Sequence, residues 1–310
     1  MVEHIPVFYA SNENYARACV VSMFSILSNT NHHIDFYVLD NRIRRSTKRK
    51  MRNALKRFNN HTLTFIPIDE KQLHGMPTYL WFTLTAYFRY YIPELCPNVN
   101  KCIYLDVDTI INYDIYDLWN VDLDGHILAA VPAEQGYLQD SNFQKHFQDM
   151  GLSNEHVYFG SGIMLFDVDL WRKRQSLSSL LKITRYHHDV IKYADQDALN
   201  ILCSPNKYKP LDTLWGRDIR TLAKERSEDK SIETTCKLVH FDGPIKPWHK
   251  KCFGGWLFWK YAKQTGLYPR PSLLKMRYLY LKYKFSKLRT RKYKKYNYIC
   301  NKTKFRAYCE

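Results

Sequence analysis

Short apolar runs and helix-like patterns alternate along the first part of the chain. The runs are short and rich in β-branched and aromatic residues, as in buried strands. The segments between them repeat apolar residues at the spacing of an amphipathic helix. In chain order this predicts strand, helix, strand, helix and strand over residues 5–10, 14–27, 35–39, 46–58 and 63–68. Ser46 is the expected N-cap of the second helix. Such alternation is typical of a parallel sheet with helices on both faces, the doubly wound α/β class.

The rest of the chain keeps this mixture and then changes composition. Further strands are expected over residues 101–105, 126–131, 162–166 and 237–241, and further helices over 83–92, 177–193, 195–202 and 256–263. A charged, Ser/Thr-rich stretch at 220–235 is typical of a loop, and Tyr268-Pro-Arg-Pro-Ser272 is typical of a linker. We therefore expect an α/β domain over residues 1–265 and a separate tail over 266–310.

The positive charge is concentrated in that tail. The chain has 47 Lys and Arg against 30 Asp and Glu, a net charge of +17. Residues 266–310 hold 14 basic residues and one acidic residue, which leaves 33 basic and 29 acidic residues in 1–265. A nearly neutral domain does not favour nucleic-acid binding. Tyrosines alternate with basic residues in the tail, so attachment to an anionic membrane surface is favoured over a solvated extension.

Cysteine use and hydropathy bear on the compartment. The eight cysteines are isolated, with no CxxC pair, which favours reduced thiols over a zinc ribbon or a redox motif. The longest uncharged stretches, 18–34 and 72–88, are too short and too polar to span a bilayer. No basic segment with a long apolar run opens the chain, so no signal peptide is expected. These features predict a cytoplasmic protein, held peripherally on the inner face of the cytoplasmic membrane.

Carboxylate pairs at i and i+2 can hold a divalent cation that neutralises a diphosphate. The chain contains Asp106/Asp108, Asp122/Asp124, Asp167/Asp169 and Asp195/Asp197. Asp122 lies in a turn signature, while Asp167 precedes a predicted helix and Asp195 opens one, so these two are candidates for N-caps. Asp106 and Asp108 follow a buried strand directly, with no helix to cap. Ligands of doubly wound sheets bind at such strand ends, so this pair is the favoured candidate.

The pair Asp106/Asp108 also allows an alternative function, that of a phosphatase. The segment 103–109 also fits the aspartyl-nucleophile strand of haloacid-dehalogenase-type phosphatases, although three strand–helix units precede it here and a late acidic pair is missing.

Near the C-terminal end of the domain, His240 ends a strand, and Gly243 and Lys246 follow in a turn. An imidazole can bind manganese and a lysine can pair with phosphate. Taken alone, His240 would more often be a packed loop residue.

In combination these segments resemble glycosyltransferase family 8, and most of all the bacterial lipopolysaccharide and lipooligosaccharide galactosyl- and glucosyltransferases. The matching motifs, in family order, are Asn14-Tyr15 and the segments 103–108, 194–200 and 240–248. The resemblance implies a GT-A fold, which is Rossmann-like and binds nucleotide sugars. It also implies a UDP-sugar donor, Mn²⁺ with Mg²⁺ as the alternative, and retention of anomeric configuration. The basic tail resembles the membrane-attaching C-terminus of such enzymes.

The resemblance also implies roles for single residues. The implied metal ligands are Asp106, Asp108 and His240. The implied donor-binding residues are Ala10, Asn12, Asn14, Tyr15, Arg89, Asp106, Val107, Asp108, Gly243 and Lys246. Asp195 and Gln196 match the pair beside the anomeric carbon, where catalysis is expected. A glutamine amide is a poor nucleophile, so a front-face, ion-pair mechanism is favoured.

Three departures from the family pattern affect specificity. Asn12 stands where an acid near the uracil is usual, and Phe159-Gly160-Ser161-Gly162 replaces Phe-Asn-Ala-Gly. After the strand at 126–131, only Glu134 could supply an expected acid. Glucose and galactose therefore both remain open as the transferred sugar. The implied partners are a UDP-sugar, a lipid-linked oligosaccharide acceptor and an anionic membrane contacted through 266–310, without nucleic acid. A UDP-binding protein without catalysis is a further alternative.

Overall fold

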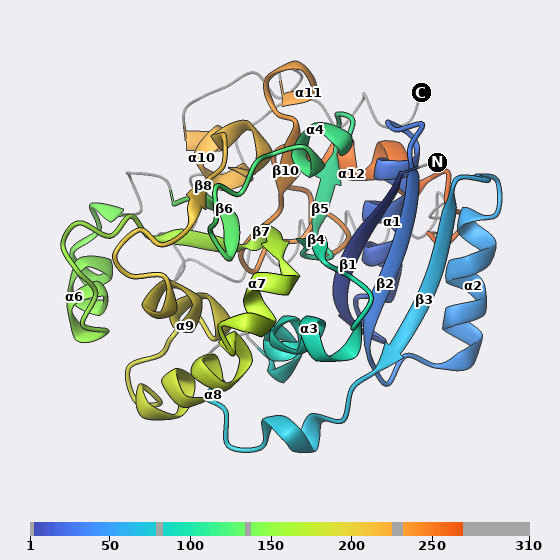
Figure 1. The fold of residues 1–310 in the computed structure, drawn as a ribbon. Coiled ribbons are helices and arrows are strands. Elements are labelled where there is room, and N and C mark those ends of the chain that lie inside the picture. Colours follow the sequence, from blue (N-terminus) through green and yellow to red (C-terminus); the bar gives the residue numbers. More distant parts are fainter. Residues whose placement is uncertain (1–2, 79–82, 134–137, 225–231, 269–310) are drawn as a thin grey trace, which may run out of the picture.

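A seven-stranded sheet forms the centre of the computed structural model, which describes residues 3–78, 83–133, 138–224 and 232–268 (Figure 1). The strand order is β3 (His61–Pro67), β2 (His33–Asn41), β1 (His4–Asn12), β4 (Lys101–Leu105), β7 (Phe159–Asp167), β6 (Leu128–Pro132) and β8 (Lys209–Pro210). Every strand expected from the sequence in this sheet is present, with ends shifted by a few residues.

The sheet is parallel on one side and mixed on the other. Strands β3, β2, β1 and β4 run in one direction, whereas β7 lies antiparallel between β4 and β6. The expected parallel direction is therefore correct for six of the strands and wrong for β7, because β6 and β8 run in the same direction as β4. Local patterns identify strands but not their direction. The antiparallel pairing places Ile163 opposite Leu105, and the Asp106 N–H donates to the Gly162 carbonyl at 2.7 Å.

A three-stranded sheet brings a late segment back to the end of β4. Its order is β5 (Thr109–Ile111), β10 (Leu238–His240) and β9 (Arg217–Asp218). Strand β10 is antiparallel to β5, with His240 opposite Thr109. The Phe241 N–H donates to the Asp108 carbonyl at 2.9 Å, which fixes this register at its end.

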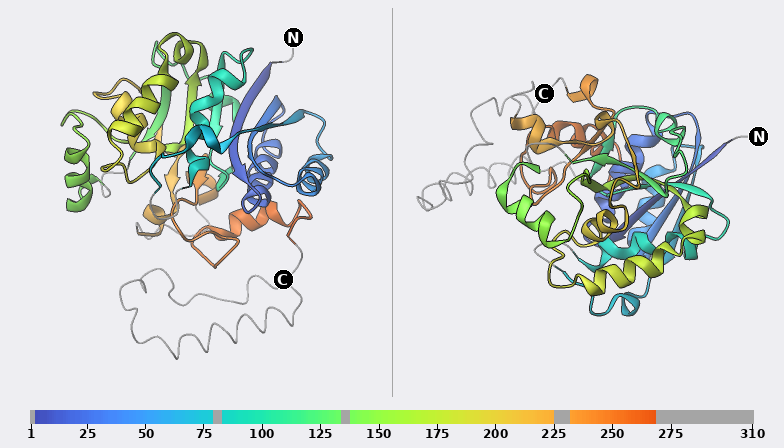
Figure 2. Two further views of the ribbon diagram at one scale, coloured as in Figure 1. Left: turned by 90° about the horizontal axis from the view of Figure 1, so that it is seen from below. Right: turned by 60° about the vertical axis from the view of Figure 1, so that its left-hand side comes forward.

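Helices cover both faces of the large sheet, as expected (Figures 1 and 2). One face packs against α1 (Ala16–Leu27), and both α2 (Arg45–Leu55) and α12 (Gly255–Ala262) pack against α1. The other face packs against η2 (Leu84–Tyr91), α3 (Ile92–Leu95), α7 (Val168–Lys173), α8 (Ser176–Tyr186) and α9 (Asp195–Leu202). Fully buried rings on the two faces include Phe24 and Phe88. Each such buried side chain contributes about 1.5–3 kcal/mol.

The remaining elements are short. They are η1 (Glu70–Leu73), α4 (Tyr116–Trp119), α6 (Ser141–Asp149), η3 (Thr213–Trp215), α10 (Ile219–Lys224) and α11 (Ile232–Thr235). The stretch expected to be a loop at 220–235 thus contains helical turns at both ends. The expected cap by Ser46 is wrong, because α2 begins at Arg45 with Arg44 as a cap residue that makes no side-chain hydrogen bond. The helix expected at 177–193 ends at Tyr186.

Two structural observations concern the predicted absence of membrane spans and the predicted reduced thiols. Among the described residues, no helix is long and apolar enough to cross a bilayer. The six cysteines within the described ranges are all free thiols, and five of them are buried. The basic tail lies beyond the described residues apart from its first three.

Candidate functional site

Three potential metal ligands meet where the two sheets join. Asp106 directly follows β4, Asp108 precedes β5, and His240 ends β10. Their ligand atoms all lie within 4.8 Å of one another. His240 Nε2 is 3.2 Å from Asp108 Oδ1 and 3.7 Å from Asp106 Oδ2. The structure therefore brings together the three residues that the sequence indicated as a metal site.

Gly162 in β7 makes room for this cluster. A Cβ atom at this position would lie 2.4 Å from His240 Cε1 and 2.8 Å from Asp106 Oδ2. Glycine within a strand often marks such a close approach. Any side chain at this position would push the imidazole and the carboxylate apart. No local signal in the segment 159–162 predicts this role for Gly162, because His240 comes from a distant part of the chain.

The charges around Asp108 compensate one another. Its buried carboxylate contacts the ammonium of Lys246 and the ring of His240. Burial alone would raise the pKa of Asp108, but the charges of Lys246 and His240 hold it well below its usual range. Burial alone would lower the pKa of His240, but the Asp108 carboxylate raises it to about 9. Without a bound cation the imidazole is therefore protonated at neutral pH, and metal binding must displace that proton.

A buried arginine joins the metal-site carboxylate to a second one. The Arg89 side chain is 4% exposed, with Nη2 3.1 Å from Asp106 Oδ1 and Nε 3.1 Å from Asp195 Oδ2. Its Nη1 donates to the Ser161 carbonyl, and Tyr104 lies under the guanidinium at 4.1 Å. Burial raises the pKa of Asp195 to about 7, although the charge of Arg89 opposes the rise. Arg89 therefore links the two carboxylate groups named by the sequence.

Asp195 does not cap its helix, contrary to the local interpretation of the sequence. The cap residue of α9 is Ala194, which has a φ of 50° and makes no side-chain cap bond. Asp195 instead points its carboxylate at Arg89 and is 2% exposed. The pairs Asp122/Asp124 and Asp167/Asp169 have the local structural roles that the sequence predicts. Asp122 accepts from the Asp124 N–H in a turn, and Asp167 caps α7 through the N–H of Leu170.

Gln196 is held by hydrogen bonds at both ends of its amide. Its Oε1 accepts from the Ser161 N–H at 3.0 Å, and its Nε2 donates to the Tyr158 hydroxyl at 3.1 Å. The Tyr158 hydroxyl donates in turn to Asp197 Oδ1 at 2.6 Å. A carboxylate can only accept, so Tyr158 must accept from Gln196, and this fixes the orientation of the amide.

Asp197 anchors that arrangement from the interior. It is fully buried, and its Oδ2 accepts from the backbone N–H groups of Lys192 and Tyr193 at 2.8 and 2.9 Å. His146 Nε2 lies 3.0 Å from the same oxygen. The sequence reasoning missed Tyr158 and His146, because their partners are separated from them by 39 and 51 positions along the chain.

The turn after β1 faces the late cluster. Asn12 Oδ1 accepts from the N–H groups of Asn14 and Tyr15 at 3.0 and 3.3 Å, which closes the turn. The Tyr15 ring lies edge-on to the Trp248 ring, with centroids 6.1 Å apart. The turn that carries the predicted nucleotide-binding residues is thus in contact with the segment that carries Lys246.

Two further predicted donor-binding residues, Val107 and Gly243, lie within the described ranges. Val107 is half-buried and packs against the core on the α1 face of the sheet. Gly243 is buried with a φ of +86°, a conformation that a side chain would strain. Glu134 lies outside the described residues.

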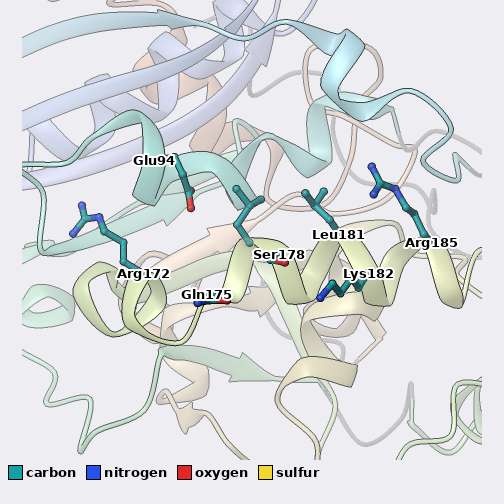
Figure 3. A pocket seen from close by; sticks show the side chains of 8 residues that line it. Glu94, Arg172, Gln175, Ser178, Leu181, Lys182 and Arg185 are labelled. Carbon is teal, nitrogen blue, oxygen red and sulfur yellow. The ribbon is translucent and has the colours of Figure 1, made fainter.

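A separate hollow of about 430 Å³ lies along α8 and shares no residue with this site (Figure 3). Arg172 lines it, but the guanidinium already donates to the carbonyls of Pro93, Cys96 and Val99 and to Asp169. This hollow therefore offers mainly exposed polar side chains, and we do not place the chemistry there.

Comparison with known protein sequences gives consistent matches. The family model described as Glycosyl transferase family 8 matches residues 6–252. A putative glycosyltransferase of Haemophilus influenzae is 30% identical over 249 residues, 79% of this chain and 73% of that protein. The lipopolysaccharide 1,2-glucosyltransferase of Escherichia coli is 27% identical over 264 residues, 80% of this chain and 74% of that protein.

Comparison with solved structures shows the same fold. The galactosyltransferase LgtC, solved with donor and acceptor sugar analogs, superposes with a TM-score of 0.73 at 23% identity, covering 86% of this chain and 98% of that one. The bifunctional glycosyltransferase WbbM gives a TM-score of 0.72 at 20% identity, covering 89% of this chain and 51% of that one. The expected GT-A fold is confirmed for the described domain.

Proposed function

Because the chain belongs to glycosyltransferase family 8, a family of retaining hexosyltransferases, we propose that it moves glucose or galactose from a UDP-sugar onto a lipopolysaccharide-type glycan. One observation carries the proposal: Asp106, Asp108, His240 and Lys246 converge at the carboxyl end of the parallel strands. The names of two relatives, a lipopolysaccharide 1,2-glucosyltransferase and a lipopolysaccharide 1,3-galactosyltransferase, support this donor and acceptor class.

Asp106, Asp108 and His240 would hold the divalent cation. Two carboxylates and an imidazole form a donor set that suits Mn²⁺, with Mg²⁺ as the alternative. Because Gly162 has no side chain, His240 and Asp106 can approach each other closely, which supports this fit. When bound, such a cation neutralises the diphosphate and stabilises the leaving UDP. Lys246, which contacts Asp108 beside this site, would pair with a phosphate oxygen of the donor.

Replacing Gly162 by alanine should weaken Mn²⁺ binding at least about tenfold, since the new methyl group would separate His240 from Asp106. Titration calorimetry or the electron spin resonance of free Mn²⁺ would measure the change. Gly160→Ala is the matched control, because its Cβ would meet Gln196 Oε1 at an ordinary 3.9 Å. Equal Mn²⁺ affinities in the two variants would contradict the proposed metal site.

The donor nucleotide would lie against the first turn. Ala10, Asn12, Asn14 and Tyr15 supply this turn, whose contact with Trp248 brings it close to the proposed diphosphate site. The Asn12 oxygen is used within the turn, so only its Nδ2 remains to donate to the uracil. The remaining proposed donor contacts are Arg89, Val107, Gly243 and Lys246, with Asp106 and Asp108 acting through the cation.

Asp195 and Gln196 would flank the transferred sugar. The Gln196 amide is hydrogen-bonded at both ends, and Asp195 is paired with Arg89, so neither is set up as a free nucleophile. We therefore favour attack of the acceptor hydroxyl from the leaving-group side, which retains the anomeric configuration and gives an α-linkage. Gln196 would orient the sugar while C1 develops oxocarbenium character. Trapping a kinetically competent sugar adduct on Asp195 or Gln196 would contradict this.

Tyr158→Phe should lower kcat about tenfold and leave the donor KM nearly unchanged. The substitution removes the hydroxyl that orients the Gln196 amide but no group that we propose to touch the nucleotide. Steady-state kinetics with varied donor would measure both constants. The exposed Tyr186→Phe is the control. A change confined to KM would contradict the orienting role.

The proposed setting is the inner face of the cytoplasmic membrane, where a lipid-linked oligosaccharide would be the acceptor. The sequence of residues 266–310, rich in tyrosine and basic residues, supports attachment there. Nucleic acid is not a proposed partner.

Incubation with a panel of UDP-sugars tests the function without a known acceptor. We expect slow release of UDP that depends on Mn²⁺ and is fastest with UDP-glucose or UDP-galactose. UDP binding without turnover, in water or with any glycan acceptor, would favour a non-catalytic protein. Hydrolysis of p-nitrophenyl phosphate in the absence of UDP-sugar would favour the phosphatase alternative.

A further inference from the structure

An unbalanced run of positive charge lies within the nearly neutral domain. Residues 41–68 contain nine Lys and Arg and no Asp or Glu. The rest of residues 1–265 holds 24 basic and 29 acidic residues, a net charge of −5. The near-neutrality of the domain is therefore an average of one strongly basic segment and an acidic remainder.

The basic segment forms an exposed face on α2, at the outer side of the molecule (Figure 1). Within this helix only Met51 and Leu55 are buried. We define the basic face of α2 by the exposed cations of this helix and of the residues that directly flank it, which are Arg42, Arg44, Arg45, Arg49, Lys50, Arg52, Lys56 and Arg57. Lys48 is set back from this face and pairs with Asp40.

This arrangement reduces the stability of the helix. No acidic residue lies in the first turn of α2, and arginines occupy both the cap position and the first helical position. Positive charge at a helix N-terminus is unfavourable, and like charges four residues apart, such as Arg45 and Arg49, repel. The Glu13 carboxylate at the start of the helix offsets the first effect, whereas the repulsion along the exposed side would be relieved by an anionic partner.

We propose that the basic face of α2 docks on the anionic phospholipid headgroups of a membrane. The neighbouring aromatic rings are covered by the cations: Arg52 lies 4.8 Å from the centroid of Phe65, and Arg57 lies 5.1 Å from that of Phe24. No free ring on this face is offered for base stacking, which single-stranded nucleic acids use. The headgroup phosphates of an anionic membrane form a dense layer of negative charge, which complements a face that offers positive charge but no free ring.

The position of the basic face of α2 in the fold fits a role in membrane docking. At one end, Arg57 Nη1 donates to Gln264 Oε1 at 3.4 Å, just before the basic sequence that begins at 266. At the other end, Glu13 accepts from the Arg44 N–H at 2.9 Å and from the Thr47 hydroxyl at 2.8 Å. The basic face of α2 is thus tied to the turn that we propose for the nucleotide. Docking through it would set the orientation of the site relative to the membrane, which a tail alone would not.

Vesicle binding of the full chain tests the proposal. In the α2 variant, Arg45, Arg49, Lys50 and Lys56 are all changed to glutamine, which keeps helix propensity. Its affinity for vesicles with about one-third phosphatidylglycerol should fall at least about tenfold. The control variant changes Lys145, Lys173, Lys182 and Lys207 to glutamine; these are exposed on or beside other helices and give the same net charge. Its affinity should stay close to that of the unchanged protein.

The possible results distinguish docking through α2 from binding by net charge alone, by the tail alone or to nucleic acid. Equal loss in both variants would mean that only net charge matters, and no loss in the α2 variant would mean that the tail suffices; either result overturns the proposal. A loss of RNA or DNA binding, with vesicle binding unchanged, would also overturn it. Mn²⁺-dependent UDP release should be the same in all three proteins, so failure of the enzymatic proposal would be seen separately. Circular dichroism would verify that both variants are folded.

Discussion

Replacing Asp108 by asparagine should lower sugar transfer at least about a thousandfold, roughly 4 kcal/mol of transition-state stabilisation, while leaving the protein folded. Asparagine keeps the size of the side chain but removes the charge that faces His240 and Lys246. Lys246 keeps the Phe241 carbonyl as an acceptor at 2.9 Å, so the turn is retained. Mn²⁺-dependent UDP release measures the loss, and a thermal melt checks the fold.

The other carboxylate pairs supply the control for this experiment. Asp122 is exposed and only accepts a hydrogen bond within its turn, which an asparagine oxygen can also do. Asp122→Asn should therefore leave the rate unchanged. Full Mn²⁺-dependent activity in Asp108→Asn would remove the central element of the proposed site.

Replacing Arg89 by alanine should lower the free energy of unfolding by about 3–5 kcal/mol and abolish activity. The change leaves the buried Asp195 without its cation and frees Asp106 from its neighbour. Urea denaturation measures the loss of stability. The exposed Arg185→Ala on α8 is the control and should change stability by less than about 0.5 kcal/mol.

The stability deficit of Arg89→Ala should grow as the pH rises from about 5 to about 8. The pKa of Asp195 is already raised to about 7, and loss of Arg89 removes the charge that opposes the rise. Well below pH 7 Asp195 keeps its proton in both folded proteins. As the pH rises past about 7 only the variant still keeps it, so the stability of the variant goes on falling while that of the unchanged protein levels off. A deficit independent of pH would mean that Asp195 is not the group left unpaired. Partial recovery in the double variant with Asp195→Asn would support the assignment.

Sequence patterns predicted the elements well where the signal is local. The first three strands and two helices follow from apolar spacing, which depends only on neighbouring residues. The direction of β7 could not be predicted, because it depends on pairing with β4 across more than 50 positions of chain. The cap at Ser46 was wrong for a related reason: at the start of α2 the Arg44 N–H and the Thr47 hydroxyl donate to Glu13, a carboxylate from a distant segment that local pattern does not show.

In the candidate site, too, local sequence signals identified some features and contacts between distant segments decided the others. The motifs named the residue types and most of the site positions, but four carboxylate pairs were locally similar. Tertiary structure distinguished them by bringing His240 to Asp108 across 132 positions and Arg89 to Asp195. Tyr158 carried no local signal, since a buried tyrosine near a strand is ordinary core until its partner is known.

The sequence by itself determined the class of fold, the family of motifs and the excess of positive charge, because each depends on residue identity and spacing. Only the tertiary structure decided which carboxylates share an arginine, where a glycine must stay, and that the basic run at 41–68 lies against the turn after β1. These features arise from contacts between distant segments, whose free energies depend on burial and distance and have no counterpart in local pattern.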